Sequence, residues 1–149
     1  MLIALFFATF GCGQKLPYEG RTVAELEAML TSERPSVRVQ AAFGLSRLGP
    51  EAMPAAPALT KALASPDPLL RTQSALALGA IGPEAHAATP ALLHALGDPE
   101  WTVRRQAALA LGEFGPIAKS ASAALQKLER ADPSHPVRKA AGAALKGIR

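Results

Sequence analysis

Residues 103–116 read VRRQAALALGEFGP, and closely similar strings stand at 70–83 (LRTQSALALGAIGP) and at 37–50 (VRVQAAFGLSRLGP). These copies are 33 residues apart, and a fourth, VRKAAGAALKGIR at 137–149, follows after 34 residues. In each copy the positions 0, 4, 8 and 11 form one helical stripe, and all of them are apolar except Ser74. A Gly-Pro pair then ends each of the first three helices, because glycine accepts a left-handed cap and proline cannot continue the helix. The repeated helix therefore determines the fold.

A shorter helix is expected ahead of each long one, because leucines recur there with the same period. The pattern begins at Leu26, and Leu30 follows four residues later on the same helical face. Thr22 and Glu25 precede this pair with the spacing of a capping box, in which the hydroxyl and the carboxylate satisfy free backbone amides. The equivalent leucines of the other units are Leu59 and Leu63, Leu92 and Leu96, and Leu125.

Two features indicate how the helix pairs stack. Turns that contain Ser, Asp and Pro separate the two helices of each pair. One position of every long helix holds a small residue, which allows neighbouring helices to approach closely. These residues are Ala42, Ala75, Ala108 and Gly142. The sequence predicts an all-α fold, a right-handed α-solenoid of about four antiparallel helix pairs, with units at approximately 22–54, 55–87, 88–120 and 121–149.

The first residues lie outside this repeat. The run LIALFFATF at 2–10 is uncharged, too short to span a bilayer as a helix, and suited to the apolar part of a signal peptide. Gly11 directly precedes Cys12, and this arrangement resembles the lipobox of bacterial lipoproteins, which makes Cys12 a candidate for lipidation. Phe10 and the absence of Lys or Arg before Lys15 depart from that pattern.

Three locations for the chain stay open at this point. The favoured one is a lipoprotein, exported to the periplasm or cell envelope and anchored to a membrane there, with residues 1–12 as signal segment and 13–21 (GQKLPYEGR) as a tether. An exported protein without a lipid anchor and a cytoplasmic protein with a hydrophobic N-terminus are the alternatives. Cys12 is the single cysteine of the chain, so no disulfide within the chain is possible.

The repeats resemble HEAT repeats, specifically the short HEAT-like repeats of phycobilin lyase subunits. The resemblance rests on the turn residues Asp98 and Asp132, on the apolar-Arg pair that opens each long helix, and on the run AALALG at 107–112. It implies that the repeated arginines bond to turn carboxylates or carbonyls of adjacent repeats, a structural role. These arginines are Arg38, Arg71, Arg104 and Arg138. Ser32 and Ser65 stand where the family has aspartate, which weakens the expected series of carboxylates at that end.

No catalytic, cofactor-binding or metal-binding residue is predicted. The three histidines (His86, His94 and His135) are isolated, and the His-Glu pairs of the HEAT-type deoxyhypusine hydroxylases are absent. The sequence also has no Gly-rich phosphate loop and no nucleophile elbow. The formal net charge of +4 comes from 16 Lys and Arg against 12 Asp and Glu, which are interspersed. Because nucleic-acid binding requires a clustered basic patch, nucleic acid is not an expected partner.

The sequence favours a non-catalytic protein–protein interaction scaffold that presents a concave surface lined by the long helices. The glutamines two residues after the repeated arginines, Gln40, Gln73 and Gln106, are expected to face water or a partner protein. Trp101 and Arg105 are further contact candidates, since an exposed tryptophan offers a large rigid apolar area. An enzyme subunit related to the phycobilin lyases and a fragment of a longer solenoid are the alternatives.

Overall fold

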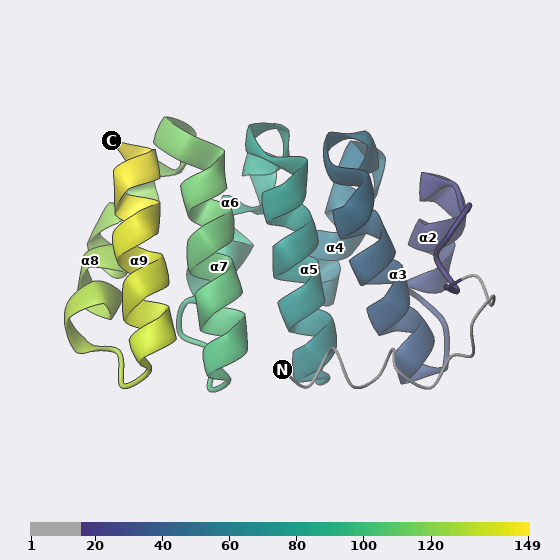
Figure 1. Cartoon of the computed structure of the whole chain (residues 1–149), viewed down its shortest axis with the longest axis horizontal. Coiled ribbons are helices and arrows are strands. Elements are labelled where there is room, and N and C mark those ends of the chain that lie inside the picture. The colour runs from purple at the N-terminus through teal and green to yellow at the C-terminus, as the bar shows by residue number, and fades with distance from the viewer. Residues whose placement is uncertain (1–15) are drawn as a thin grey trace.

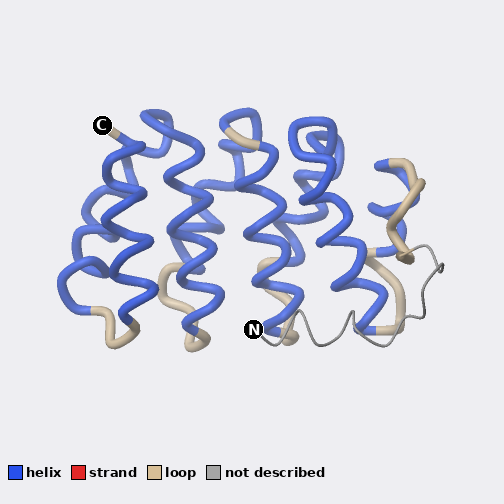
Figure 2. Tube along the Cα trace, viewed as in Figure 1, coloured by secondary structure: helices blue, strands red, loops and turns tan. Residues whose placement is uncertain are grey.

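The structure, a computed structural model, describes residues 16–149, and every regular element in this part of the chain is a helix (Figure 2). The predicted α-solenoid is confirmed, because helix pairs stack side by side in two layers (Figure 1). The first helices of the pairs are α2 (Val23–Met29), α4 (Ala56–Ala62), α6 (Thr89–Ala95) and α8 (Ser122–Ala131). The second helices are α3 (Pro35–Leu48), α5 (Pro68–Ile81), α7 (Trp101–Phe114) and α9 (His135–Ile148).

Local chemistry explains where the helices begin and end. The Thr22 hydroxyl accepts a hydrogen bond from the Glu25 amide at 3.3 Å, and the Glu25 carboxylate accepts one from the Thr22 amide at 2.8 Å, which is the predicted capping box. The second helices α3, α5 and α7 end at Gly49, Gly82 and Gly115. Their φ values of 59°, 88° and 65° lie in the left-handed region that glycine adopts at little cost.

Three short 3₁₀ helices, which the sequence analysis did not predict, connect one unit to the next. They are η1 (Gly49–Ala55), η2 (Pro83–Ala88) and η3 (Gly115–Ala121). Each begins at a Gly-Pro pair, where proline has the backbone angle of a helical turn and lacks an amide that would need a partner. The tight turns of the 3₁₀ helix then reverse the chain within a few residues. Each second helix therefore leads directly into the first helix of the next unit.

The core lies between the two layers and consists mainly of leucine and alanine. The leucines that repeat in the first helices are at most 1% exposed. They are Leu26, Leu59, Leu92 and Leu125. From the second helices, Leu45, Leu78 and Leu111 are 0% exposed and meet them across the interface. The core therefore continues from unit to unit as a thin layer instead of closing into one globule.

Neighbouring second helices approach each other closely at Gly79 and Gly112. A Cβ atom added to Gly79 would lie 3.1 Å from the Cα atom of Ala110, and one added to Gly112 would lie 2.8 Å from the Cα atom of Ala144. Both contacts are with main chain, which cannot swing aside as a flexible side chain can. The spacing of α7 and α9 therefore leaves no room for a side chain at Gly112, and the spacing of α5 and α7 makes a methyl group at Gly79 a tight fit.

Replacing Gly112 with alanine is expected to lower the free energy of unfolding by roughly 1–3 kcal/mol, because the added methyl overpacks the contact between α7 and α9. A Cβ atom added to Gly142 would lie 2.8 Å from the Oε1 atom of Glu129. Since that carboxylate ends an exposed side chain that can turn away, Gly142→Ala should stabilise by up to about 1 kcal/mol through helix propensity. Urea unfolding of both variants measures whether each substitution lowers or raises the free energy of unfolding. Equal destabilisation by both would contradict the close approach at Gly112.

The residues that precede α2 cover the open end of the first unit. Tyr18 packs edge-on against Phe43, with ring centroids 5.3 Å apart. A Cβ atom on Gly44 would lie 2.6 Å from the Tyr18 Cβ, so the tyrosine sits where α3 carries no side chain. Part of the predicted tether is therefore folded against α3 and belongs to the first unit.

Candidate interaction surface

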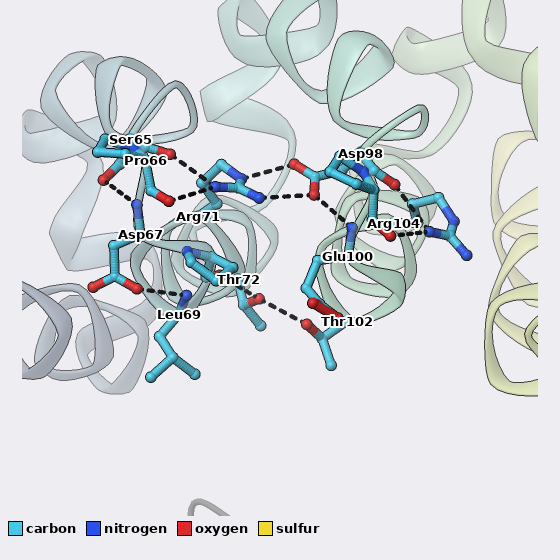
Figure 3. A network of polar contacts seen from close by, with 12 residues as sticks. Ser65, Pro66, Asp67, Leu69, Arg71, Thr72, Asp98, Glu100, Thr102 and Arg104 are labelled. Atoms are coloured by element: carbon cyan, nitrogen blue, oxygen red, sulfur yellow. Dashed lines mark hydrogen bonds and ion pairs between the residues drawn. The ribbon is translucent and has the colours of Figure 1, made fainter.

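Arginines at the start of the second helices join successive units. Arg71 on α5 lies between the turn of its own unit and the turn of the next (Figure 3). Its Nη1 donates hydrogen bonds to the carbonyl oxygens of Ser65 and Pro66, at 2.9 and 3.2 Å. Its Nε and Nη2 donate to Oδ2 and Oδ1 of Asp98, at 2.7 and 2.9 Å. This planar two-bond match fixes the position of one unit against the next.

Arg104 on α7 repeats the arrangement one unit later. Its Nε and Nη2 donate to Asp132 at 2.8 and 3.1 Å, and its Nη1 donates to the carbonyl oxygens of Asp98 and Pro99 at 2.9 and 3.0 Å. The Asp132 side chain is only 2% exposed and that of Arg104 12%. We call the two pairs, Arg71–Asp98 and Arg104–Asp132, the ladder.

The repeated arginines at the two ends bond only to the turns of their own units. Arg38 donates from Nη1 to the carbonyl oxygens of Ser32 and Glu33, at 2.7 and 3.2 Å. Arg138 donates from Nη1 to the two carbonyl oxygens of the turn before α9, at 2.7 and 3.1 Å. Within the described residues no carboxylate bonds to either guanidinium group. All four arginines therefore hold a turn, and two of them also join units through a carboxylate.

Both ladder carboxylates have a lowered pKa. The hydrogen bond from Arg104 lowers the pKa of Asp132 against the opposing effect of burial. Burial raises the pKa of Asp98, but the hydrogen bonds from Arg71 and from the Glu100 amide, with the nearby positive charges, outweigh it and hold that pKa below its ordinary value. A carboxylate whose pKa is lower in the folded chain stabilises the fold above its unfolded pKa. That stabilisation is lost as the pH falls through the folded pKa.

Lowering the pH is expected to remove the contribution of the ladder to stability. At neutral pH the wild-type chain should be more stable than the Asp98→Asn, Asp132→Asn double variant. The difference should shrink as the pH falls below about 4, where the carboxylates become protonated. Urea unfolding followed by circular dichroism at a series of pH values measures both curves. A difference that stays constant down to about pH 2 would mean that folding does not change the two pKa values.

The side of the second helices that points away from the first helices carries apolar residues. Leu69 and Leu76 lie two turns apart on one side of α5, and Thr102 and Leu109 hold the same positions on α7. Leu69 is 55% exposed and points away from the Arg71 guanidinium (Figure 3). Each second helix contributes one residue to what we call the apolar row, and all of these residues are at least partly exposed. The row is Phe43, Leu76, Leu109 and Ala143.

The second helices also carry most of the positive charge of the helices. Together they hold eight Lys or Arg residues and one acidic residue, Glu113. The first helices hold three basic and three acidic residues, so the surplus is confined to one layer. The basic residues outside the ladder are Arg38, Arg47, Arg105, Arg138, Lys139 and Lys146. A cationic layer of this kind attracts an acidic partner.

The predicted column of glutamines is not a row that faces water. Gln73 is 4% exposed and its Oε1 has no hydrogen-bond partner among the described residues, whereas Gln40 and Gln106 are partly buried. The expectation of exposure was wrong for Gln73. This residue lies four positions before Ala77, whose counterpart Ala110 contacts the preceding second helix. The position therefore turns toward the preceding second helix, which for Gln73 is α3.

The other predicted contact residues are accessible. Trp101 is 43% exposed at the first residue of α7. Arg105 is partly exposed and lies four residues before Leu109, on the same side of that helix. Cys12 and the predicted signal segment lie outside the described residues.

The sequence analysis missed the apolar row and Leu69. A signal for them was present, because Leu69 and Leu76 are seven residues apart and Leu109 repeats Leu76 after one period. These leucines stand beside the core stripe in the sequence, so hydropathy alone does not separate them from core residues.

Within the described residues there is no group of three or more His, Cys, Asp or Glu side chains that could hold a metal ion. None of the helices between residues 16 and 149 is both long and apolar enough to cross a membrane.

Comparison with known proteins identifies the repeat. A family model for HEAT repeats matches residues 23–89 and 83–146. The chain belongs to the HEAT-repeat family. The two matches to this family together cover all four helix pairs, so the second helices and the ladder lie within matched HEAT units. No protein with a curated description matches the sequence.

Solved structures similar to this HEAT-repeat chain include two engineered proteins, each 29% identical to it over 85% of its length, with TM-scores of 0.72 and 0.69. The chain spans only 62% and 37% of those two proteins. It is also similar to the complex of CpcE and CpcF of phycocyanin lyase from a Nostoc species, with a TM-score of 0.67 and 19% identity over 82% of this chain and 79% of that one. At this identity the likeness shows a common fold.

Proposed function

We propose that this HEAT-repeat chain is a non-catalytic scaffold that binds another protein through its second helices. One observation carries the proposal: the apolar row and the surplus of positive charge occur on the same layer of helices. Apolar contacts supply affinity, and complementary charges select the partner and speed its association. The partner that suits this surface is a protein segment with both apolar and acidic side chains.

Two substitutions test the surface without changing the core. Leu69→Glu and Arg105→Glu each place a negative charge on the second helices, at side chains that are exposed or partly exposed. Matched controls place the same charge elsewhere: Ile117→Glu in η3, where the side chain is 54% exposed, and Lys127→Glu on α8. All four variants should keep the helical circular dichroism of the wild type.

The full chain captures its partner from a lysate of its own organism, and mass spectrometry identifies it. Binding of the purified partner is then measured by calorimetry. Each test variant should bind about tenfold more weakly or worse, whereas the controls should bind like the wild type. Wild-type affinity in both test variants would place the interaction on another surface, and the absence of any stoichiometric partner would refute the scaffold role.

A subunit of a bilin lyase is the rival proposal, supported by fold similarity to the phycocyanin lyase structure. A subunit of that kind would bind an open-chain tetrapyrrole and shift its visible absorbance. We expect no shift when bilin is mixed with the purified chain. A saturable shift would favour the lyase-like role over the scaffold.

We also propose that the scaffold is anchored to a membrane through Cys12. The support is the uncharged run at residues 2–10, the small residue before the cysteine, and the position of both outside the repeat. In a bacterial host, a fatty-acid analogue should label the wild-type chain and not the Cys12→Ala variant. An unlabelled full-length chain in the soluble cytosolic fraction would refute the anchor and leave the surface proposal untouched.

A further inference from the structure

Ser65 interrupts the ladder between the first and second units. Its Oγ accepts a hydrogen bond from the Asp67 amide at 3.2 Å, as Oδ1 of Asp98 accepts one from the Glu100 amide at 2.9 Å. The serine side chain therefore occupies the same place in its turn as the aspartate does one unit later. It supplies the acceptor for the amide but no carboxylate for the arginine of the preceding unit, Arg38.

Arg38 is nevertheless held in the orientation of the ladder arginines. Its Nη1 donates to the carbonyl oxygens of Ser32 and Glu33 at 2.7 and 3.2 Å, which matches the bonds from Arg71 Nη1 to Ser65 and Pro66 at 2.9 and 3.2 Å. Two such bonds fix the plane of a guanidinium group. The Nε and Nη2 edge of Arg38 has no hydrogen-bond partner among the described residues, and in Arg71 and Arg104 this edge binds a carboxylate.

The surroundings of this edge are open to solvent. Arg38 and Ser65 are both partly exposed, so a ligand can reach the junction. The carboxylate nearest in sequence to Ser65 belongs to Asp67, and it is engaged in capping α5 through the Leu69 amide at 2.9 Å. At the other helix, the N-cap of α3 is Arg34, whose side chain makes no cap hydrogen bond and adds a positive charge near the junction.

We propose that the edge of Arg38 facing Ser65 is a binding site for a carboxylate from outside the fold. The ladder pairs of this same chain show the expected mode, two parallel bonds from Nε and Nη2 to the two oxygens. The carboxylate comes either from a free organic acid or from an Asp or Glu side chain of a bound protein. This site does not depend on the apolar row or on the proposed scaffold function.

The Nε–H resonance of Arg38 reports directly on this edge. In the ¹⁵N-labelled full chain it is assigned by comparison with Arg38→Lys. It is then followed during titration with acetate, which represents a free acid, and with N-acetyl-aspartate amide, which represents a protein side chain, each exchanged for chloride at constant ionic strength. Both should shift the resonance with half-saturation on the order of 10–100 mM, as expected for one charge-assisted pair open to solvent. Saturation by acetate alone would assign the site to free acids, and saturation by the aspartate amide alone to protein side chains.

Ser65→Asp provides the decisive control, because it places a carboxylate of the chain itself in the site. In this variant the Arg38 resonance should sit near those of Arg71 and Arg104 without any ligand and should no longer respond to acetate. The midpoint of thermal unfolding should rise by about 2–4 °C. Ser65→Asn keeps the shape without the charge, and it should behave like the wild type in both measurements.

Three outcomes would overturn the proposal. The Arg38 resonance could stay unmoved by both carboxylates in the wild type. It could respond to them equally in Ser65→Asp, which would place the binding elsewhere. It could also respond to inorganic phosphate and to neither carboxylate, which would assign the edge to a different anion.

Discussion

Asp132→Asn is expected to lower the free energy of unfolding by roughly 3 kcal/mol, because removing one partner of a buried ion pair leaves the other charge without compensation. The Asp132 side chain is 2% exposed and receives both bonds of the Arg104 fork, at 2.8 and 3.1 Å. Asparagine keeps the acceptor for the Ser134 amide, so the helix start is preserved. It lacks the charge and turns an amide nitrogen toward the arginine.

Asp67→Asn is the matched control for this prediction. It makes the same chemical change at a turn aspartate that caps α5 and whose carboxylate, among the described residues, forms no hydrogen bond or ion pair with an arginine. Because asparagine caps helices nearly as well as aspartate, the control should cost less than about 0.5 kcal/mol. Urea unfolding compares the two. In an Arg104→Gln background the cost of Asp132→Asn should fall sharply, and an unchanged cost would show that the pair is not the cause.

Leu78→Ala is expected to lower the free energy of unfolding by roughly 2–5 kcal/mol, through lost burial and the cavity left behind. Leu78 is 0% exposed and lies toward the C-terminal end of α5, where the core of its unit joins those of the units on either side. The large expected effect follows from this complete burial, since few neighbouring atoms can move to fill the space.

Leu69→Ala makes the same change on the opposite side of the same helix. Leu69 is 55% exposed, so its truncation should change the free energy of unfolding by no more than about 0.5 kcal/mol. Chemical denaturation of the two variants tests which face of α5 is buried. If the two truncations cost the same, the assignment of the core face is wrong.

The repeat made the fold predictable from the sequence. Four copies of one helical pattern reinforce each other, so an error at one position does not change the assignment. Helix starts and ends followed from local chemistry at Thr22, Glu25 and the Gly-Pro pairs. The 3₁₀ helices were not predictable in this way, because the backbone angle of proline suits a 3₁₀ helix and an α-helix equally.

The surface was less predictable, because hydropathy describes one helix at a time. Gln73 is polar, and its own helix gives no sign that α3 covers it. Leu69 is apolar, and its own helix gives no sign that nothing covers it. The burial of these two residues is decided by neighbouring helices that lie far from them along the chain. Tyr18 shows the same limit, since its partner Phe43 belongs to another element.

The direction of the ladder has a consequence for how such a domain can change length. Arg71 reaches forward to Asp98, and both residues lie within the stretch 68–100. A duplication of that stretch would therefore carry a complete ionic joint with it. The close contact between units would survive too. The original Gly79 would face Ala77 of the inserted copy, in the place where Gly79 otherwise meets Ala110. Duplication or loss of a whole period would lengthen or shorten the domain in a single genetic event, with no compensating substitution needed at the seams between units.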